Sequence, residues 1–319
     1  MAGFHKSAGE KMAEQKIDAQ SWALLAQLGL IWGASFFFTG VAAKELPALL
    51  IVFARVGLAA LILIPFHLLI QGPLPRDAKT WIAAGGMSLL NNVLPFTAIA
   101  WGQHYIGSGL ASVVNATTPM FAAAFMALFA VEALTSRKVV ALALGLLGVI
   151  LLKGGNFGDL GEQTLGILAI TFASACYGLS TVWSKKRLIG IPPLTTATCQ
   201  LITSGLVMAI LAFAFSTPAL YLTAPWHVLA ALLASAAIAT ALAYLLFFYI
   251  INRAGPSFVT LVTMLVPVSA IILGVLFLGE GFTAHEALGS ALVALALVII
   301  DGRALIKLGI VRPAPALRP

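Results

Sequence analysis

Arg55 is a cation in the middle of a long apolar run, residues 48–71. Leaving an arginine there costs about 2.5–3.5 kcal/mol on insertion scales, so its presence calls for a reason. One hypothesis is that Arg55 binds the carboxylate of a substrate or gates an outer vestibule. The other is that its long side chain snorkels to headgroups or to helix-end carbonyls. Both interpretations stay open on the sequence alone.

Amides and hydroxyls gather in two later apolar runs and in the turn between them. In hydrocarbon such groups need partners, and the commonest partner is a neighbouring helix. Helix–helix bonding therefore competes with a cavity wall for each residue, although their concentration in one helix pair favours a cavity wall for some. These residues are Asn91, Asn92, Gln103, Asn115, Thr117 and Thr118. His104, beside Gln103, is a further candidate at the outer mouth, although a boundary role is the commoner one.

Aromatic residues form the third group with chemical potential. Rings near the ends of a span are usually interfacial anchors, whereas rings toward the centre can line a cavity. An aromatic cavity with scattered amides suits amino acids that have apolar or amphipathic side chains. The rings expected toward the centre are Trp32, Phe36, Phe96, Trp101, Tyr177, Trp183, Tyr244 and Phe248.

The sequence shows no constellation typical of an enzyme. It contains no phosphate-binding glycine loop, no histidine pair at metal spacing and no nucleophile elbow, so neither a cofactor nor a metal is expected. Cys176 and Cys199 lie in separate apolar runs and are interpreted as small core residues. No carboxylate lies deep in an apolar run, which argues against proton coupling through a buried acid and leaves other routes of coupling open.

The composition of the chain indicates that these residues lie in membrane-spanning helices. The 319 residues are 61% hydrophobic and 9% charged, against roughly 45–50% and 25% in soluble domains. A bilayer accepts such a chain, and about 20 helical residues cross its hydrocarbon core. Ten runs of that kind are predicted, which makes the protein an all-α polytopic membrane protein. They are residues 22–41, 48–71, 80–101, 107–130, 138–154, 164–184, 193–215, 227–249, 256–279 and 284–306.

The cations predict the orientation of these spans. With the amino terminus in the cytoplasm, 15 of the 18 Lys and Arg fall inside and only Lys44 and Lys153 fall outside, while Arg55 lies within a span. That bias is the positive-inside signal, and it predicts a multi-pass protein with both termini in the cytoplasm. The cations are scattered between apolar runs, so no nucleic-acid partner is expected despite the net charge of +7.

The two halves of the sequence resemble each other. Trp32 matches Tyr177 and Arg55 matches Gln200 at an offset of 145, while Glu132 matches Glu280 at an offset of 148. Five spans per half is an odd number, so the second copy must enter the membrane upside down. The prediction is two inverted five-helix repeats around a central cavity, residues 22–154 and 164–306, with cytoplasmic tails at 1–21 and 307–319. Inverted repeats are typical of secondary transporters.

Several motifs also resemble the EamA type of the drug/metabolite transporter superfamily. The first half carries NNVLPF at 91–96, WGQ at 101–103, SGLAS at 108–112 and NATTP at 115–119. The second half carries ALAY at 241–244, RAG at 253–255, PVSA at 267–270 and LFLGE at 276–280. Within that superfamily the chain looks most similar to bacterial amino-acid and metabolite exporters of the YddG type. The resemblance covers residues 22–306 and implies a basket of ten helices around a central cavity.

The expected function is secondary transport or facilitated export of amino acids and related small metabolites, by alternating access across the bacterial inner membrane. Its expected partners are a small-molecule substrate and the lipid bilayer. Uptake of a sugar-like or other polar metabolite is an alternative within transport. An intramembrane enzyme is an alternative from another class, but it would need a buried acid, metal ligands or a nucleophile with a base, and none of these is grouped here.

Overall fold

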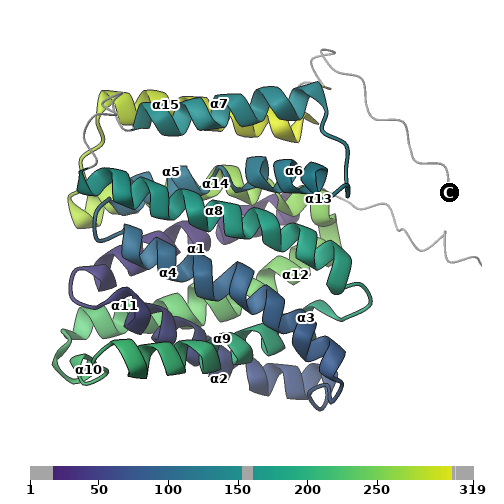
Figure 1. Cartoon of the computed structure of the whole chain (residues 1–319), viewed down its shortest axis with the longest axis vertical. Helices are drawn as coiled ribbons and strands as arrows, with labels where there is room; N and C mark the ends of the chain where they lie inside the picture. Colours follow the sequence, from purple (N-terminus) through teal and green to yellow (C-terminus); the bar gives the residue numbers. More distant parts are fainter. Residues whose placement is uncertain (1–16, 153–160, 304–305, 307–319) are drawn as a thin grey trace, which may run out of the picture.

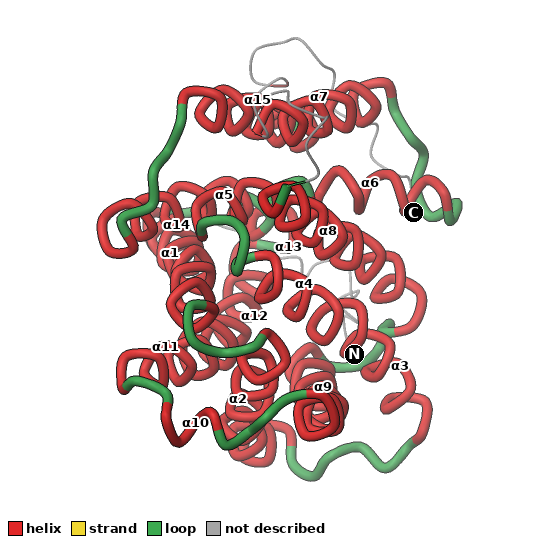
Figure 2. The backbone as a smooth tube through the Cα atoms, turned by 60° about the vertical axis from the view of Figure 1, so that its left-hand side comes forward, coloured by secondary structure: helices red, strands yellow, loops and turns green. Residues whose placement is uncertain are grey.

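The computed structural model describes residues 17–152, 161–303 and 306, and within these residues the chain is helical and contains no strand (Figures 1 and 2). Most of the expected amino-terminal tail, the connection at 153–160 and the carboxy-terminal tail lie outside the described residues. An all-helical chain satisfies every backbone donor and acceptor within each span, as hydrocarbon requires. The prediction of an all-α polytopic membrane protein is confirmed.

The helices of the first half follow the apolar runs. They are α1 Ala19–Ala43, α2 Ala48–Gln71, α3 Ala78–Ser88, the π-helical turn η2 Leu89–Val93, α4 Leu94–Gly102, α5 Ser108–Asn115, α6 Thr118–Leu128 and α7 Ser136–Leu152. The segments α3, η2 and α4 form one continuous helix, Ala78–Gly102. The helices α5 and α6 together make one candidate span, Ser108–Leu128, with a turn at Ala116 and Thr117 between them.

The helices of the second half repeat this order. They are α8 Glu162–Arg187, α9 Pro193–Phe215, the short α10 Leu220–Thr223, α11 Trp226–Ala236, the π-helical turn η3 Ala237–Leu242, α12 Ala243–Ala254, α13 Pro256–Val259, α14 Val262–Leu278 and α15 Ala284–Asp301. Here α11, η3 and α12 form the continuous helix Trp226–Ala254. The runs expected at 107–130 and 256–279 are each interrupted, between α5 and α6 and between α13 and α14.

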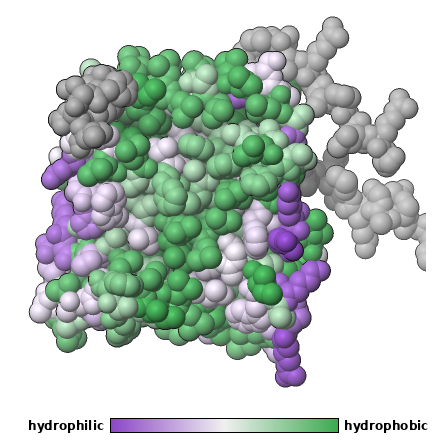
Figure 3. Space-filling model, in the orientation of Figure 1, coloured by the Kyte–Doolittle hydropathy of each residue, from purple (hydrophilic) through white to green (hydrophobic). Residues whose placement is uncertain are grey.

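Length and hydropathy support membrane insertion. Among the described residues, eight helices are long and apolar enough to cross a bilayer, and α14 is a shorter apolar helix. Figure 3 shows a broad apolar band between two hydrophilic edges, the pattern expected of a bilayer-embedded protein. In Figure 1 the helices run across the view from one of these edges to the other, and α1 begins on the side where α15 ends.

The first helix of each half packs against helices of the other half. In the first half α1 packs against α14, and in the second half the equivalent helix α8 packs against α5 and α6. The helices α2 and α9 pack against each other, as do α7 and α15, which lie together at one edge in both views (Figures 1 and 2). Glycines permit the close packing of α1 on α14 and of α8 on α6. A Cβ at Gly33 would lie 2.7 Å from the Val266 carbonyl oxygen, and one at Gly178 would lie 2.8 Å from the Ala122 nitrogen.

The π-helical turns also occupy equivalent positions. The turn η2 begins at Leu89 and η3 begins at Ala237, 148 residues later. A π turn inserts one residue into a helix and is frequent at functional sites. These turns are not predicted from the sequence. Each lies in the middle of its continuous helix, Ala78–Gly102 or Trp226–Ala254.

Candidate functional site

Arg55, in α2, lies buried against one of the π turns. Its Nε donates a hydrogen bond to Thr240 Oγ1 of η3 at 3.0 Å. Its guanidinium carbon lies 3.9 Å from the centre of the Phe96 ring of α4, a cation–π contact. The side chain is only 7% exposed. Arg55 is thus held on one edge and on one face, and it does not snorkel out to the headgroups.

Gln200 makes the equivalent contacts in the other half. Its Nε2 donates to Asn92 Oδ1 of η2 at 2.8 Å and to the Tyr244 hydroxyl at 3.3 Å. Asn92 and Thr240 are 148 residues apart, and so are Phe96 and Tyr244. Each half therefore sends one polar side chain from the second helix of a repeat, α2 or α9, onto a π turn and an aromatic ring.

The charge of Arg55 is not balanced by a carboxylate. The ion pairs of the described residues join Lys138 and Lys185 to Glu132, Arg253 to Asp18, and Arg303 to Asp301. Arg55 takes part in none of them. Its Nε is used by Thr240, whereas the two terminal nitrogens make no hydrogen bond within the described chain. A guanidinium with unused donors has the geometry to bind an anionic group through two parallel hydrogen bonds.

A network of amides and hydroxyls continues from Gln200. The Tyr244 hydroxyl donates to Asn92 Oδ1 at 3.2 Å, and Asn92 Nδ2 donates to Ser204 Oγ at 3.0 Å. Ser204 Oγ also lies 2.9 Å from Ser88 Oγ. Asn91 and Ser180 extend the network, with Ser180 Oγ donating to Asn91 Oδ1 at 3.4 Å. These bonds join the helices that contain η2 and η3 to α8 and α9.

The structure brings together part of the expected set of residues. Among the expected residues, Arg55 contacts Phe96, and Asn92 is bonded to Tyr244. Arg55 is joined to the helix of Tyr244 through Thr240. Tyr177 is partly buried between the two hydrophobic clusters of the core.

Two more rings of the set extend this aromatic group. Phe248 lies 6.3 Å from Tyr244 between ring centres and 5.7 Å from Phe247. Trp32 packs 5.5 Å from Phe247. The central cluster is here defined as Trp32, Arg55, Asn92, Phe96, Tyr177, Gln200, Thr240, Tyr244 and Phe248.

Other expected residues lie outside the central cluster. Trp101 is 41% exposed and packs 4.8 Å from Tyr105. Trp183 donates from Nε1 to the Ala83 carbonyl at 2.9 Å, and its ring occupies the space beside Gly86. Phe36 is part of the hydrophobic core.

The residues near the end of α4 also stay outside the central cluster. Gln103 donates to the Phe36 carbonyl at 2.9 Å, and a ring nitrogen of His104 lies 2.9 Å from the Ala100 carbonyl oxygen. Asn115, the last residue of α5, carries a buried side-chain oxygen with no partner within the described residues.

Sequence reasoning missed Thr240 and the serines of the network. Thr240 differs in residue type from its equivalent Asn92, so matching of identical residues did not reveal it. The repeat offset was sufficient, because adding 148 to Asn92 gives Thr240 and adding 148 to Phe96 gives Tyr244. Ser88 and Ser204 carry no such signal, since their equivalents at 236 and 59 are alanines.

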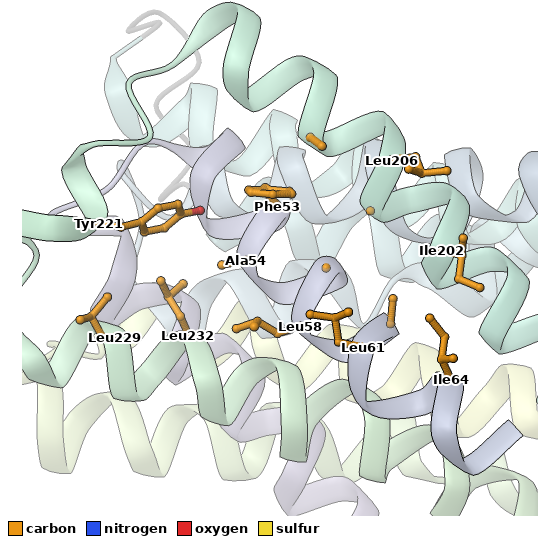
Figure 4. A pocket seen from close by; sticks show the side chains of 14 residues that line it. Phe53, Ala54, Leu58, Leu61, Ile64, Ile202, Leu206, Tyr221, Leu229 and Leu232 are labelled. Carbon is orange, nitrogen blue, oxygen red and sulfur yellow. The ribbon is translucent and has the colours of Figure 1, made fainter. Parts of the chain in front are cut away.

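Apart from the central cluster, a concave region lies between α2, α9 and α11 (Figure 4). It has a volume of about 640 Å³ and is lined almost entirely by apolar side chains, such as Phe53, Leu61 and Leu206. The Tyr221 hydroxyl donates to the Leu50 carbonyl at 2.6 Å, so it offers its proton to no ligand. A polar solute would find little to bind there. The central cluster, which is mostly buried in this conformation, is the candidate site.

Comparison with known proteins places the chain in a family. The sequence model of the EamA-like transporter family matches it over residues 20–153 and again over residues 164–301. The uncharacterized transporter YvbV of Bacillus subtilis is 27% identical over 284 residues, covering 87% of this chain and 90% of that protein. The uncharacterized inner membrane transporter YedA of Escherichia coli is 26% identical over 282 residues, covering 86% and 89%.

Among solved structures that match, one illustrates the shared fold. It is described only as "Crystal structure of protein", and it superposes with a TM-score of 0.62 at 18% identity, covering 91% of this chain and 98% of that chain. The family matches together span most of the sequence. The helices, the apolar band and these matches lead to one conclusion: the chain belongs to the EamA-like transporter family and is a multi-pass membrane transporter.

Proposed function

We propose that the protein exports amino acids and related small metabolites across the bacterial inner membrane by alternating access. The observation that carries the proposal is the buried guanidinium of Arg55, which has no carboxylate partner in the described chain. A charge at this depth is costly, so it is retained where it meets an opposite charge. A substrate carboxylate supplies that charge and matches the planar fork of the arginine.

The surroundings of Arg55 favour a substrate that also has an apolar part. Phe96 covers one face of the guanidinium, and Tyr244, Phe248 and Trp32 belong to the same aromatic group. Aromatic walls with a few polar groups suit small amphipathic molecules. The proposed substrate is therefore a zwitterion with an apolar side chain, held by its carboxylate at Arg55.

The same arrangement favours transport over catalysis. The central cluster offers a charge, amides and rings, but the described residues contain no group of three or more metal-ligating side chains. Inverted repeats allow one bundle to rock against the other around a site at the midplane. In the proposed cycle the buried central cluster opens alternately to the two sides, with both termini in the cytoplasm.

Flux into proteoliposomes tests the function. The purified protein should exchange at least one amino acid of a complete panel, measured with and without imposed pH and voltage gradients. The gradients also decide whether transport is coupled to protons. Flux of a sugar panel with no flux of any amino acid would overturn the proposal in favour of uptake of a polar metabolite.

Variants of Arg55 test the site. Arg55→Gln should fold, because a glutamine occupies the equivalent position 200, and it should raise the KM for the amino acid by at least tenfold, the order of one charge-assisted hydrogen bond. Arg55→Lys keeps the charge but loses the planar donor pair, so it should retain partial transport. Unchanged flux in Arg55→Gln, at equal membrane abundance, would remove Arg55 from the site.

A further inference from the structure

We propose that Thr240 is a positioning residue for Arg55, and that this hydroxyl sets the preference of the transporter for substrates that carry a carboxylate. The inference rests on the proposed function, since it concerns how Arg55 meets the substrate. It adds a second residue, from the opposite half of the chain, to the recognition of the anionic group.

The hydroxyl of Thr240 has a fixed direction. Its proton is donated to the Ser235 carbonyl oxygen at 2.9 Å, five residues earlier, across the π turn. Its lone pairs are then left for Arg55, whose Nε donates to Oγ1 at 3.0 Å. Thr240 is only 1% exposed, so water does not compete for these bonds. The π turn thus places an oriented acceptor beside the arginine.

Two contacts together fix the plane of the guanidinium. Phe96 contacts its face at 3.9 Å, and Thr240 holds its Nε edge. The remaining edge carries the two terminal nitrogens, which is the edge that binds a carboxylate with two parallel hydrogen bonds. Without Thr240 the ring contact would still hold the face but would permit rotation of the guanidinium within its plane. The binding edge would then lose its fixed direction.

The equivalent pair in the other half shows the contrast. Both protons of Gln200 Nε2 are used within the protein, one on Asn92 and one on Tyr244. Arg55 has more N–H donors than the described protein groups accept, whereas Gln200 Nε2 has no proton left for a ligand. Recognition of an anion is therefore assigned to the Arg55–Thr240 half, and the Gln200–Asn92 half joins helices.

Replacement of the hydroxyl tests the inference. Thr240→Val keeps the shape and removes the acceptor, so we expect the KM for the transported amino acid to rise about tenfold, the effect of one lost hydrogen bond to a charge. The maximal rate should change by less than about twofold, because a contact made equally in the bound state and during the transport step affects the KM and not the maximal rate. Thr240→Ser keeps the hydroxyl and should restore the wild-type KM.

A matched threonine controls for packing. Thr198 of α9 is fully buried and donates its hydroxyl to the Leu194 carbonyl at 2.8 Å, with no arginine nearby in its hydrogen bonds. Thr198→Val should leave the KM unchanged. Inhibition of flux by L-leucine and by L-leucinamide gives a second readout, because the amide lacks the carboxylate. Thr240→Val should reduce the discrimination between these two inhibitors, and Thr198→Val should not.

A double variant separates the possible failures. In an Arg55→Gln background, Thr240→Val should have no further effect on the KM, because the group that it positions is gone. If Arg55→Gln impairs transport but Thr240→Val leaves both the KM and the inhibitor preference unchanged, the positioning role is overturned while the proposed function stands. If wild-type protein moves no amino acid, the proposed function falls and this inference falls with it.

Discussion

The carboxylate of Glu280, just after α14, accepts the backbone N–H of Ser108, at the start of α5, at 2.6 Å. Its other oxygen accepts the Gly109 N–H and the Ser108 hydroxyl, each at 3.0 Å. Gly279 adopts a left-handed φ of 66°, which turns the chain so that Glu280 faces α5. A Cβ at Gly107 would lie 2.8 Å from the Glu280 carboxyl carbon, so a larger residue there would displace it. The Glu280 side chain thus accepts hydrogen bonds from the free N–H groups at the start of α5, although it is far from α5 in the sequence.

Removal of this carboxylate should loosen the end of the bundle that is proposed to face outward. Glu280→Gln replaces one acceptor with a donor that faces N–H groups, at a cost of about 1.5–3 kcal/mol. Ser112→Cys, one turn along α5 and fully buried, reports on the opening of the bundle around α5. In a background without Cys176 and Cys199, Glu280→Gln should speed external labelling of that cysteine about tenfold or more.

Glu286 supplies the control for this prediction. It is also buried near the same end of the bundle, but within the described residues its carboxylate bonds only to Thr283 in its own capping box. Glu286→Gln should therefore leave the labelling of Ser112→Cys unchanged. Equal acceleration by both glutamine variants would mean that Glu280 stabilises the fold in general and does not join the two helices specifically.

Glu132, the equivalent of Glu280 in the first half, has different partners and a pH-dependent role. It pairs with Lys138 at 3.1 Å and with Lys185, and these lysines, Lys185 first, lower the pKa of Glu132 below its ordinary value of 4.5. Because the folded pKa is depressed, the stabilisation is complete above about pH 4.5 and is lost as the pH falls through the folded pKa.

Thermal unfolding in detergent measures this effect. The difference in melting temperature between wild type and Glu132→Gln should be constant from about pH 8 to pH 5 and should shrink below pH 4.5. It should also be small, since the Glu132 side chain is 42% exposed and exposed ion pairs contribute about 0–1 kcal/mol. A difference that grows on acidification would contradict the assigned ion pairs.

The sequence predicts the spans well because hydrocarbon thickness imposes their length. The run expected at 48–71 matches α2 at both ends, and the run expected at 193–215 matches α9. Proline and glycine at the breaks mark these ends whatever the packing. The π turns are different. An extra residue inside a helix that is apolar all round leaves the hydrophobic pattern unchanged, so η2 and η3 leave no trace in it.

The candidate site is less accessible to sequence reasoning, for a related reason. In a membrane protein an apolar ring can face lipid or the interior, and hydropathy does not separate the two. Trp101 therefore looked like Trp32 in the sequence, yet it is 41% exposed while Trp32 packs against Phe247. Charge is a clearer signal. Arg55 stands out in the sequence because of the free-energy cost of placing an arginine within an apolar span. Its partner Thr240 could be found only through the repeat offset or the structure.

Trp32 and Tyr177, which occupy equivalent positions 145 residues apart, should both be required for transport. Trp32→Leu removes the ring that packs 5.5 Å from Phe247, and Tyr177→Leu removes a ring between the two hydrophobic clusters. Each variant should reduce proteoliposome flux severalfold, since a loss of about 1 kcal/mol in substrate contact is about a fivefold change. Membrane abundance should stay near wild type. Normal flux in both variants would assign these rings to packing alone.

The predicted inversion of the two halves can be tested at pairs of equivalent residues. Lys44 follows α1 and Ile189 follows α8, at an offset of 145, and both are exposed. If the second half is inverted, these two positions lie on opposite sides of the membrane, with Lys44 outside and Ile189 in the cytoplasm. The cation bias gives the same assignment, because Lys185, Lys186 and Arg187 lie just before Ile189.

Single cysteines at these two positions test the arrangement in a background without Cys176 and Cys199. An impermeant thiol reagent applied to intact cells should label Lys44→Cys at once, and it should label Ile189→Cys only after the membrane is permeabilised. Both cysteines are accessible in the folded protein, so a difference in labelling reports the side of the membrane and not burial. Labelling of both positions from the same side would contradict the inverted repeat, because two parallel copies would place equivalent loops together.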